Sequence, residues 1–189
     1  MVQRLVVFNS TSLDGYFADA KGDMGFAHNP EQDAEFTAFT SSNASGDGAL
    51  LFGRKTYELM ERFWPTPAAA KAMPEVAAGM NRLRKYVFSR TVKSVSWQNT
   101  VLLKGDLVSE VRRIKSEPGG GIAILGSGSI IAQLAPHGLI DEYQVVLVPR
   151  VLGGGRTMFE GLAAQLPLKL TKSRAFKNGN VLLCYEPVR

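Results

Sequence analysis

Apolar residues along the chain fall into two kinds of segment, and the two kinds alternate. One kind is a short, nearly continuous apolar run, which is typical of a buried strand. The other spaces its apolar residues three or four positions apart, as on one face of a helix. The runs lie at residues 4–10, 49–52, 86–88, 101–103, 122–125 and 144–148, and the helical spacing lies at residues 30–42, 54–61, 106–115 and 129–135.

This alternation predicts an α/β fold, with a mostly parallel central sheet flanked by helices. The chain ends differently, because residues 168–176 and 181–185 both have the composition of strands and only Lys-Asn-Gly-Asn separates them. Asn-Gly between two strands favours a tight turn, so we expect a C-terminal antiparallel hairpin. The length fits one domain over residues 1–189.

Two further segments carry weaker patterns. Residues 68–83 are alanine-rich and weakly helical, and we expect Pro74 and Gly79 to interrupt them. Residues 24–29 have the composition of a loop. The helix at residues 30–42 is expected to open on Pro30, which suits a first helical turn.

A glycine turn, Gly126-Ser127-Gly128, separates the apolar run at 122–125 from a helix that Pro136 ends. We expect Ser127 or Ser129 to cap this helix. Glycines let a backbone approach a ligand closely, and free helix N–H groups favour a phosphate. Tight strand-to-helix turns also favour Gly and Ser without any ligand, so the pattern alone leaves both explanations open.

A second strand-to-helix junction contains Gly53, Arg54, Lys55 and Thr56. Cations at a helix N-terminus oppose the helix dipole. A bound phosphate explains their presence better than a solvent-exposed basic surface without a ligand does. Ser89-Arg90 follows the next apolar run, where it is either a third anion contact or only the exit of a strand.

Two loops could cover a ligand. Leu13, Asp14 and Gly15 follow the first run, either as a simple turn or as a loop that closes over a ligand at the end of the strand. The glycine-rich residues 150–156 form either a surface loop, a border of the ligand site or a subunit contact.

Charge and composition narrow the class of ligand. The chain of 189 residues has a net charge of +5, and the charge is uneven: −4 over residues 1–60, +6 over 61–118 and +3 over 119–189. No basic helix with interleaved aromatics is present, so we expect a polyanionic small molecule and not a nucleic acid.

Other classes are excluded by what the sequence lacks. A single cysteine, Cys184, and two histidines, His28 and His137, argue against a disulfide and against a metal site. No apolar run reaches the ~20 residues of a membrane span. A cytoplasmic location is expected.

Taken in order, the motifs SLDGYFA, LFGRKTYE, VFSR, ILGSGS, IDEY and LVPRVLGGG resemble the dihydrofolate reductase-like fold. The similarity is greatest to the reductase domain at the C-terminus of bifunctional riboflavin-biosynthesis proteins. It spans residues 4–186, and the order and spacing of the motifs make it specific.

The resemblance implies an NADPH-dependent reductase that transfers hydride to a heterocyclic or ribosylamino substrate. It also implies a homodimer, and residues 145–148, which look buried on both faces, agree with one. Carried over by position, the implied cofactor-binding residues are Leu13, Gly15, Gly53, Arg54, Lys55, Thr56, Ser89, Arg90, Gly126, Ser127, Gly128 and Ser129.

The family positions also give candidate catalytic acids. Asp14 is the first choice for the proton or substrate group. Asp33 and Glu35, which lie in the helix before the Gly-Arg motif, are the second choices. Arg150 and Arg156 are candidates for a substrate phosphate. The Pro-Trp that dihydrofolate reductases carry before this helix is missing, as is any deaminase segment.

Three other functions compete with this one. The first is a dihydrofolate reductase, which the missing Pro-Trp argues against. The second is a non-catalytic nucleotide- or flavin-binding module, and the third is a nucleic-acid-binding protein.

Overall fold

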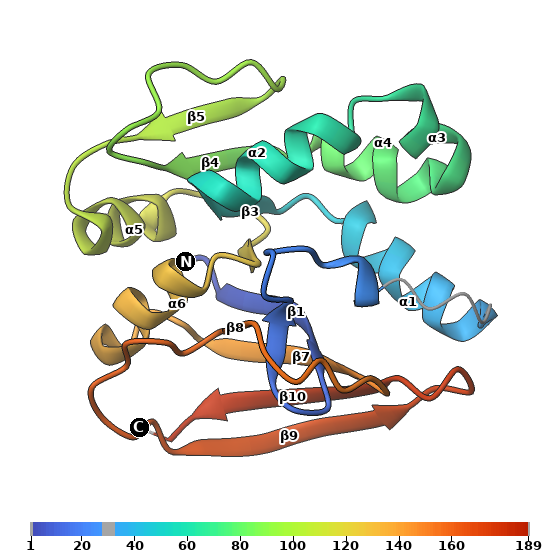
Figure 1. Ribbon diagram of the computed structural model, residues 1–189. Helices are drawn as coiled ribbons and strands as arrows, with labels where there is room; N and C mark the ends of the chain where they lie inside the picture. The colour runs from blue at the N-terminus through green and yellow to red at the C-terminus, as the bar shows by residue number, and fades with distance from the viewer. Residues whose placement is uncertain (1, 28–32, 189) are drawn as a thin grey trace.

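The computed structural model describes residues 2–27 and 33–188. Its main sheet has eight strands in the order β5-β4-β3-β6-β1-β7-β10-β9 (Figure 1). The strands are β1 (Leu5–Ser12), β3 (Ala49–Gly53), β4 (Arg84–Phe88), β5 (Thr100–Leu103), β6 (Ile122–Leu125), β7 (Glu142–Val148), β9 (Leu168–Ala175) and β10 (Val181–Pro187). The helices are α1 (Ala34–Ser45), α2 (Arg54–Phe63), α3 (Pro67–Ala72), α4 (Pro74–Arg82), α5 (Leu107–Ser116) and α6 (Gly128–Leu134), with short 3-10 helices η1 (Gly25–Ala27) and η2 (Ala135–His137).

Strand direction confirms the expected mixed sheet. The six strands from β5 to β7 run parallel to their neighbours. β10 is antiparallel to both β7 and β9. The turn between β9 and β10 contains Gly179 with φ +82°, a conformation that glycine adopts without strain. The C-terminal hairpin is therefore confirmed.

Helices cover the two faces of the sheet in different places. On one face, α5 and α6 bury residues such as Val111 and Ile131 against β1 and β6. On the other face, α2 and α4 pack on β3 and β4 through Tyr57 and Met80. α1 packs on the same second face, where Phe36 contacts Phe176 near the C-terminal hairpin.

The N-terminal end of α1 differs from the expectation. Pro30 lies outside the described residues, and α1 begins at Ala34. Asp33 is its N-cap: the carboxylate accepts from the backbone N–H of Glu35 at 2.8 Å and of Phe36 at 3.1 Å. The helix also continues to Ser45, beyond the end that the sequence predicts.

The alanine-rich region forms two helices, α3 and α4. Pro74 separates them, as predicted, by starting the first turn of α4. Gly79 does not interrupt α4, so that part of the prediction was wrong. A Cβ at Gly79 would lie 2.1 Å from the carbonyl oxygen of Ala44, because α1 crosses α4 at that point. Gly79 is therefore a close-packing residue.

A two-stranded ribbon was not predicted. It pairs β2 (Tyr16–Ala18) with β8 (Arg156–Thr157), and joins the loop after β1 to the glycine-rich loop after β7. A Cβ at Gly155 would lie 2.1 Å from the carbonyl oxygen of Ala18, which is why the ribbon needs glycine there. The segment at 24–27 is also more regular than expected, since η1 forms within it.

No helix built from residues 2–27 and 33–188 is long and apolar enough to cross a membrane. Over the same residues, no group of three or more His, Cys, Asp or Glu side chains is arranged to hold a metal ion. Cys184 is buried in the sheet, as expected of an inert core thiol.

Candidate functional site

The C-terminal ends of the parallel strands meet at one edge of the main sheet. β1 and β6 pair as far as Phe8 and Leu125. β3 pairs with the other side of β6, and with β4 as far as Gly53 and Phe88. The segments that follow these four positions are therefore brought to the same edge, which is where open α/β sheets bind ligands.

Asn9 fixes the glycine turn to β1. Its side-chain carbonyl accepts from the backbone N–H of Gly126 at 2.5 Å, and its amide donates to the Gly126 carbonyl at 3.1 Å. The amide also lies 3.2 Å from the sulfur of Met158, just after β8. Asn9 is buried, and it escaped the sequence analysis although a polar residue within an apolar run was a visible signal.

Ser127 joins the glycine turn to the start of α2. Its hydroxyl accepts from the backbone N–H of Gly53 at 2.9 Å and lies 3.1 Å from the Thr56 hydroxyl. Thr56 in turn accepts from the backbone N–H of Ser127 at 3.2 Å. The prediction that a Ser127 or Ser129 side chain caps α6 was wrong for Ser127, the N-cap residue, which has φ +57° and makes no side-chain cap bond.

The glycines of the turn are required by packing within the chain. Gly126 has φ +58°, and a Cβ there would lie 2.8 Å from the Thr56 hydroxyl oxygen. A Cβ at Gly128 would lie 3.1 Å from both the Phe17 ring and the Thr157 carbonyl oxygen. The turn is thus held between α2 on one side and the β2–β8 ribbon on the other. Of the two explanations left open by the sequence, tight packing accounts for these two glycines without a ligand.

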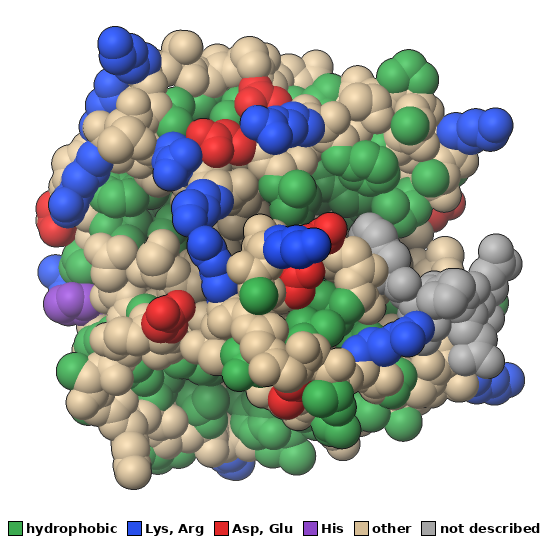
Figure 2. Space-filling model, viewed as in Figure 1, with side chains coloured by type: hydrophobic (Ala, Val, Ile, Leu, Met, Phe, Trp, Pro, Cys, Tyr) green, Lys and Arg blue, Asp and Glu red, His purple; other side chains and the backbone are tan. Residues whose placement is uncertain are grey.

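The start of α2 remains open to an anion. Gly53 is the N-cap and has no side chain to cap the first-turn N–H groups. Arg54 and Lys55 are exposed there, and Arg54 lies 3.3 Å from Glu58 one turn later. Figure 2 shows Lys and Arg side chains gathered over the start of α2. Because the uncapped first turns of α2 and α6 meet through Ser127 and Gly53, the arrangement fits a phosphate or pyrophosphate.

The other polar residues that were predicted to bind the cofactor differ in whether their side chains are free to contact a ligand. The Ser89 hydroxyl is buried and accepts from the backbone N–H groups of Thr91 at 3.2 Å and Val92 at 3.1 Å, so it shapes the turn after β4. Arg90 and Ser129 are exposed. Ser89 therefore orients the turn that carries Arg90, and Arg90 and Ser129 are free to face a ligand.

Asp14 ties the loop after β1 to the loop after β7. The Ser12 hydroxyl donates to the Asp14 carboxylate at 2.6 Å, and the backbone N–H groups of Leu152 and Gly153 donate at 3.1 and 2.7 Å. The Ser12 hydroxyl, with the two backbone donors, holds the pKa of Asp14 below its ordinary value despite some desolvation. Asp14 is therefore ionised at neutral pH, which suits an anchor and does not suit a proton donor.

The residues around Asp14 lie on the exposed surface of the loops after β1 and β7. Leu13 donates its backbone N–H to the Arg150 carbonyl at 2.7 Å, while its side chain is exposed. Gly15 has φ +87°, and a Cβ there would meet no atom within 4 Å, so it turns the chain in open space. Arg150 and Arg156 are both exposed, and neither forms a described ion pair.

The two acids of α1 have other partners. Besides its two capping bonds, Asp33 accepts from the backbone N–H of Asn178 at 3.2 Å, in the β9–β10 turn. Burial raises the pKa of Asp33, but the donors, with Phe36 first, outweigh it and hold that pKa below its ordinary value. Glu35 is exposed and pairs with Arg174 at 2.9 Å. These contacts give both acids a role in holding α1 on the hairpin.

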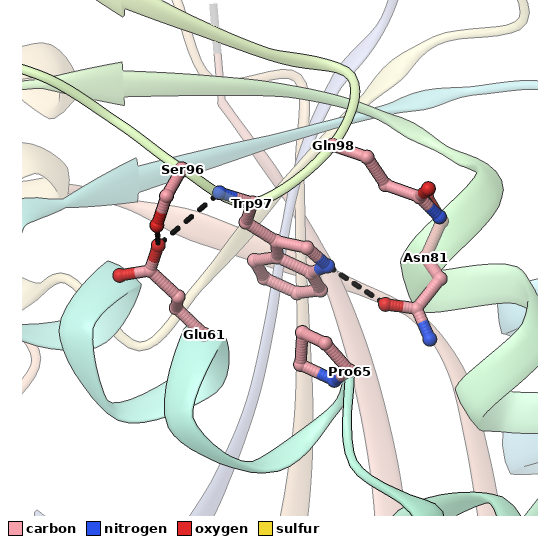
Figure 3. A pocket seen from close by; sticks show the side chains of 6 residues that line it. All are labelled: Glu61, Pro65, Asn81, Ser96, Trp97 and Gln98. Carbon is pink, nitrogen blue, oxygen red and sulfur yellow. Dashed lines mark hydrogen bonds between the residues drawn. The ribbon is translucent and has the colours of Figure 1, made fainter.

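An open pocket of about 490 Å³ lies elsewhere, at the N-terminal ends of β4 and β5 (Figure 3). Its acid, Glu61, accepts from the Tyr57 hydroxyl at 2.7 Å, from the Ser96 hydroxyl and from the backbone N–H of Trp97 at 3.1 Å. The Trp97 indole donates to Asn81 at 2.7 Å. These bonds fix the loop before β5 to α2 and α4, so the pocket is explained as structural.

Comparison with known proteins identifies the family of the chain. The model of the RibD C-terminal domain family matches residues 3–182. The chain belongs to the RibD C-terminal domain family. A Bacillus subtilis relative of this RibD-type chain, YyaP, is 27% identical over 184 residues, covering 97% of the chain and 95% of YyaP.

Solved structures extend the comparison to the fold. A putative riboflavin biosynthesis protein from Shewanella sp. PV-4 is 27% identical with a TM-score of 0.74, and each chain covers 100% of the other. A dihydrofolate reductase from Enterococcus faecalis, solved with NADP(H), is 13% identical with a TM-score of 0.65, over 98% of this chain and 97% of that one. The RibD-type chain therefore has the dihydrofolate reductase-like fold, as its motifs predicted.

Proposed function

We propose that this RibD-type chain is an NADPH-dependent reductase that acts at the C-terminal edge of the parallel strands. The observation that carries the proposal is the meeting of two uncapped helix starts, those of α2 and α6. Arg54 and Lys55 lie in the first turn of α2, and the exposed Arg90 follows the adjacent strand β4. A dinucleotide with an additional phosphate matches that concentration of positive potential. Membership of a family of reductases supports the same choice.

The residues around the edge divide into three groups by the role that each could have in binding a dinucleotide. Thr56 and Ser127 bond to each other and Asn9 bonds to the backbone of Gly126, so these three residues form the wall that holds the two helix starts together. Arg54, Lys55, Arg90 and Ser129, with the backbone of Gly53 and Gly128, remain open to phosphate oxygens. Leu13, Gly15, Ser89 and Gly126 shape the loops and turns that surround them.

NADPH, when bound, supplies the hydride. The protein's part is to hold an electrophilic carbon of the substrate against the nicotinamide and to exclude water. Asp14 serves this end by joining the loops after β1 and β7 into one cover. We propose it as a positioning residue, because an ionised carboxylate with three donors has no proton to give.

For the substrate we propose a heterocycle or its ribosylamino derivative, of the type of 5-amino-6-(5-phosphoribosylamino)uracil. The Shewanella protein, which covers the whole chain, is described as a putative riboflavin biosynthesis protein, and this supports the class. Arg150 and Arg156, exposed on the loop and strand after β7, are the available cations for a substrate phosphate.

Cofactor selectivity tests the proposal. Nicotinamide fluorescence titrations with NADPH and NADH should give a clear preference for NADPH. Arg54→Ala should weaken NADPH by about 1.5 kcal/mol, roughly tenfold in Kd, and weaken NADH much less. Arg62→Ala is the matched control, since Arg62 is an exposed arginine in the last turn of the same helix. Equal affinities for the two cofactors would refute the proposal.

Dihydrofolate is a poorer substrate on structural grounds. A pterin ring needs an acid on α1 to accept from its amino and ring nitrogens, and Asp33 and Glu35 already have partners. We therefore expect weak or absent dihydrofolate reduction and poor methotrexate affinity. A non-catalytic nucleotide- or flavin-binding module would leave NADPH unoxidised with every heterocycle offered. Measuring NADPH oxidation after mixing with a ribosylaminopyrimidine therefore distinguishes such a module from a reductase.

We also propose that the protein acts as a homodimer. The expectation comes from the resemblance to RibD-type reductase domains. The sequence also suggested that residues 145–148 are buried on both faces, but Val145 and Leu147 are only partly buried. Their exposure in the single chain leaves room for a second copy.

A further inference from the structure

Arg54, the first residue of α2, already has a carboxylate partner within the chain. Its Nη1 atom lies 3.3 Å from Oε1 and 3.4 Å from Oε2 of Glu58, which is one turn later in the helix. The Arg54 side chain is 43% exposed and the Glu58 side chain 39%. Figure 2 shows acidic as well as basic side chains over α2. This ion pair is therefore accessible to an anion from solution.

The other cations that we assign to a ligand have no such partner. Within the part of the chain that the structure describes, Lys55, Arg90, Arg150 and Arg156 form no ion pair. Arg54 differs from them, although it lies directly at the start of the helix. A phosphate that binds Arg54 therefore has to compete with a carboxylate, whereas a phosphate that binds Lys55 or Arg90 does not.

The position of Arg54 on α2 separates it from the glycine turn. Thr56 contacts that turn through Ser127, and residues two apart in a helix point about 200° apart around its axis. Arg54 therefore lies on the flank of α2 that faces away from the turn. The glycine turn follows β6 and Arg90 follows β4, and these two strands lie on opposite sides of β3. An anion at Arg54 is thus distinct from one held by the glycine turn.

Glu58 is the acid of α2 that can compete for Arg54. Side chains of a helix lean toward its N-terminus, so the Glu58 carboxylate reaches back toward the first turn. The second acid of α2, Glu61, accepts from the Tyr57 hydroxyl at 2.7 Å and from the backbone N–H of Trp97 at 3.1 Å. These bonds hold Glu61 on the loop before β5. A phosphate at the start of α2 therefore meets the negative charge of Glu58 beside Arg54.

We propose that Glu58 sets the cofactor preference by competing with the additional phosphate of NADPH for Arg54. The inference rests on the proposed function, which supplies the ligand of Arg54. On binding NADPH, the guanidinium exchanges the Glu58 carboxylate for the phosphate, and the charge of Glu58 remains nearby. NADH lacks this phosphate and leaves the ion pair in place. Glu58 therefore lowers the affinity for NADPH and makes its preference over NADH smaller than the cations alone would give.

The strength of the ion pair permits this exchange. An exposed pair four residues apart on a helix contributes little, and this contact uses one nitrogen of Arg54 at 3.3 Å or more, without a bidentate geometry. A phosphate carries more charge and forms shorter bonds to a guanidinium, so it displaces Glu58. The loss of the ion pair and the repulsion that remains together weaken NADPH binding roughly threefold.

The test compares Kd values for NADPH and NADH from nicotinamide fluorescence titrations. Glu58→Gln should tighten NADPH binding roughly threefold and change NADH binding little. Glu75→Gln is the matched control, because it removes an equal charge from an exposed acid in the first turn of α4 and should leave both Kd values unchanged. Thermal unfolding of Glu58→Gln should stay close to that of the wild type, since the ion pair is exposed.

Removal of Arg54 separates competition from simple repulsion. In an Arg54→Ala background, Glu58→Gln should tighten NADPH binding less than twofold, because no guanidinium is released. An equal gain in both backgrounds overturns the competition for Arg54. NADPH affinity that is unchanged or weaker in Glu58→Gln, in a protein that still prefers NADPH, overturns the role of Glu58 and leaves the proposed function standing. A wild type with equal affinities for NADPH and NADH refutes the proposed cofactor and this inference together.

Discussion

The Ser127 hydroxyl accepts a hydrogen bond from the backbone N–H of Gly53 at 2.9 Å, between residues 74 positions apart. That bond occupies the acceptor that would otherwise cap α6, and it joins the starts of α2 and α6. The Thr56 hydroxyl completes the junction at 3.1 Å. The geometry of the proposed phosphate site therefore depends on a buried hydroxyl that does not itself need to touch the cofactor.

Ser127→Ala should lower both stability and cofactor affinity. The change leaves the Gly53 N–H without its acceptor in a part-buried position, which costs about 1–3 kcal/mol. Urea unfolding should show that loss, and NADPH affinity should fall with it. Ser129→Ala is the control for the stability measurement, because Ser129 lies on the same turn with an exposed side chain. Equal stability of the two variants would contradict the role given to Ser127.

Gly79→Ala should destabilise the contact between α1 and α4. The added methyl group would lie 2.1 Å from the Ala44 carbonyl oxygen, and backbone must move to admit it. Overpacking of this kind costs about 1–3 kcal/mol or more. Gly46→Ala is the comparison: Gly46 has no atom within 4 Å of the Cβ position and φ −66°, so it should gain ~0.4–1 kcal/mol. Thermal unfolding of both variants measures the difference.

The sequence predicted the part of this fold that depends on local pattern. Apolar runs and helical spacing gave the strands, the order of motifs gave the family, and Asn-Gly gave the hairpin turn. The cations at the start of α2 were identified because they oppose the helix dipole, an effect within one turn. Gly79 was misjudged because helix propensity penalises glycine, whereas the crossing of α1 requires it.

What escaped prediction depends on contacts between distant segments. Asn9 meets Gly126 only because β1 lies beside β6 in one register. Asp14 meets Gly153 because a ribbon joins the loops after β1 and β7. Asp33 was considered as a catalytic acid, yet its cap on α1 and its bond to Asn178 are set by how the hairpin packs. Residue type alone does not distinguish these roles.

Asp14→Asn should lower turnover of the true substrate more than Asp33→Asn or Glu35→Gln does. The amide keeps one acceptor but loses the charge and the second oxygen that hold Leu152 and Gly153. We expect kcat to fall while NADPH affinity changes little, since the cations of α2 are untouched. Steady-state assays of the three variants test this order. A larger loss of turnover in Asp33→Asn than in Asp14→Asn would give the role in turnover to Asp33 instead of Asp14.

The low pKa of Asp14 also gives a pH dependence. The Ser12 hydroxyl stabilises the ionised form in the folded chain, so the unfolded chain binds a proton first as pH falls. The contribution of Asp14 to stability is therefore present above its unfolded pKa and is lost as pH falls through its lowered folded pKa. The free energies of unfolding of the wild type and Asp14→Asn, plotted against pH, should converge in acid. Curves that stay parallel would show that the hydrogen bonds of the Asp14 carboxylate contribute nothing to stability.

Lys85 provides the opposite case at alkaline pH. Its side chain is fully buried on β4, and its ammonium donates to three carbonyl oxygens at the end of α4: those of Met80 at 2.8 Å, Asn81 at 3.1 Å and Leu83 at 2.7 Å. The ammonium also lies 4.5 Å from the centre of the Trp97 ring. Burial lowers the pKa of Lys85 to about 8 from an ordinary value of 10.5. The carbonyls and the indole favour the charged form, so they limit this shift.

Because the folded pKa of Lys85 is the lower one, the unfolded chain binds more protons between about pH 8 and 10.5, and stability should rise with pH across that window. Lys85→Met should abolish the rise, which amounts to at most ~3 kcal/mol. The quantity to measure is the wild-type free energy of unfolding minus that of Lys85→Met, from urea titrations at successive pH values. Subtraction removes the tyrosines and Cys184, which titrate in both proteins. A difference that stays constant with pH would show that the three carbonyls and the indole fully offset the burial of the ammonium.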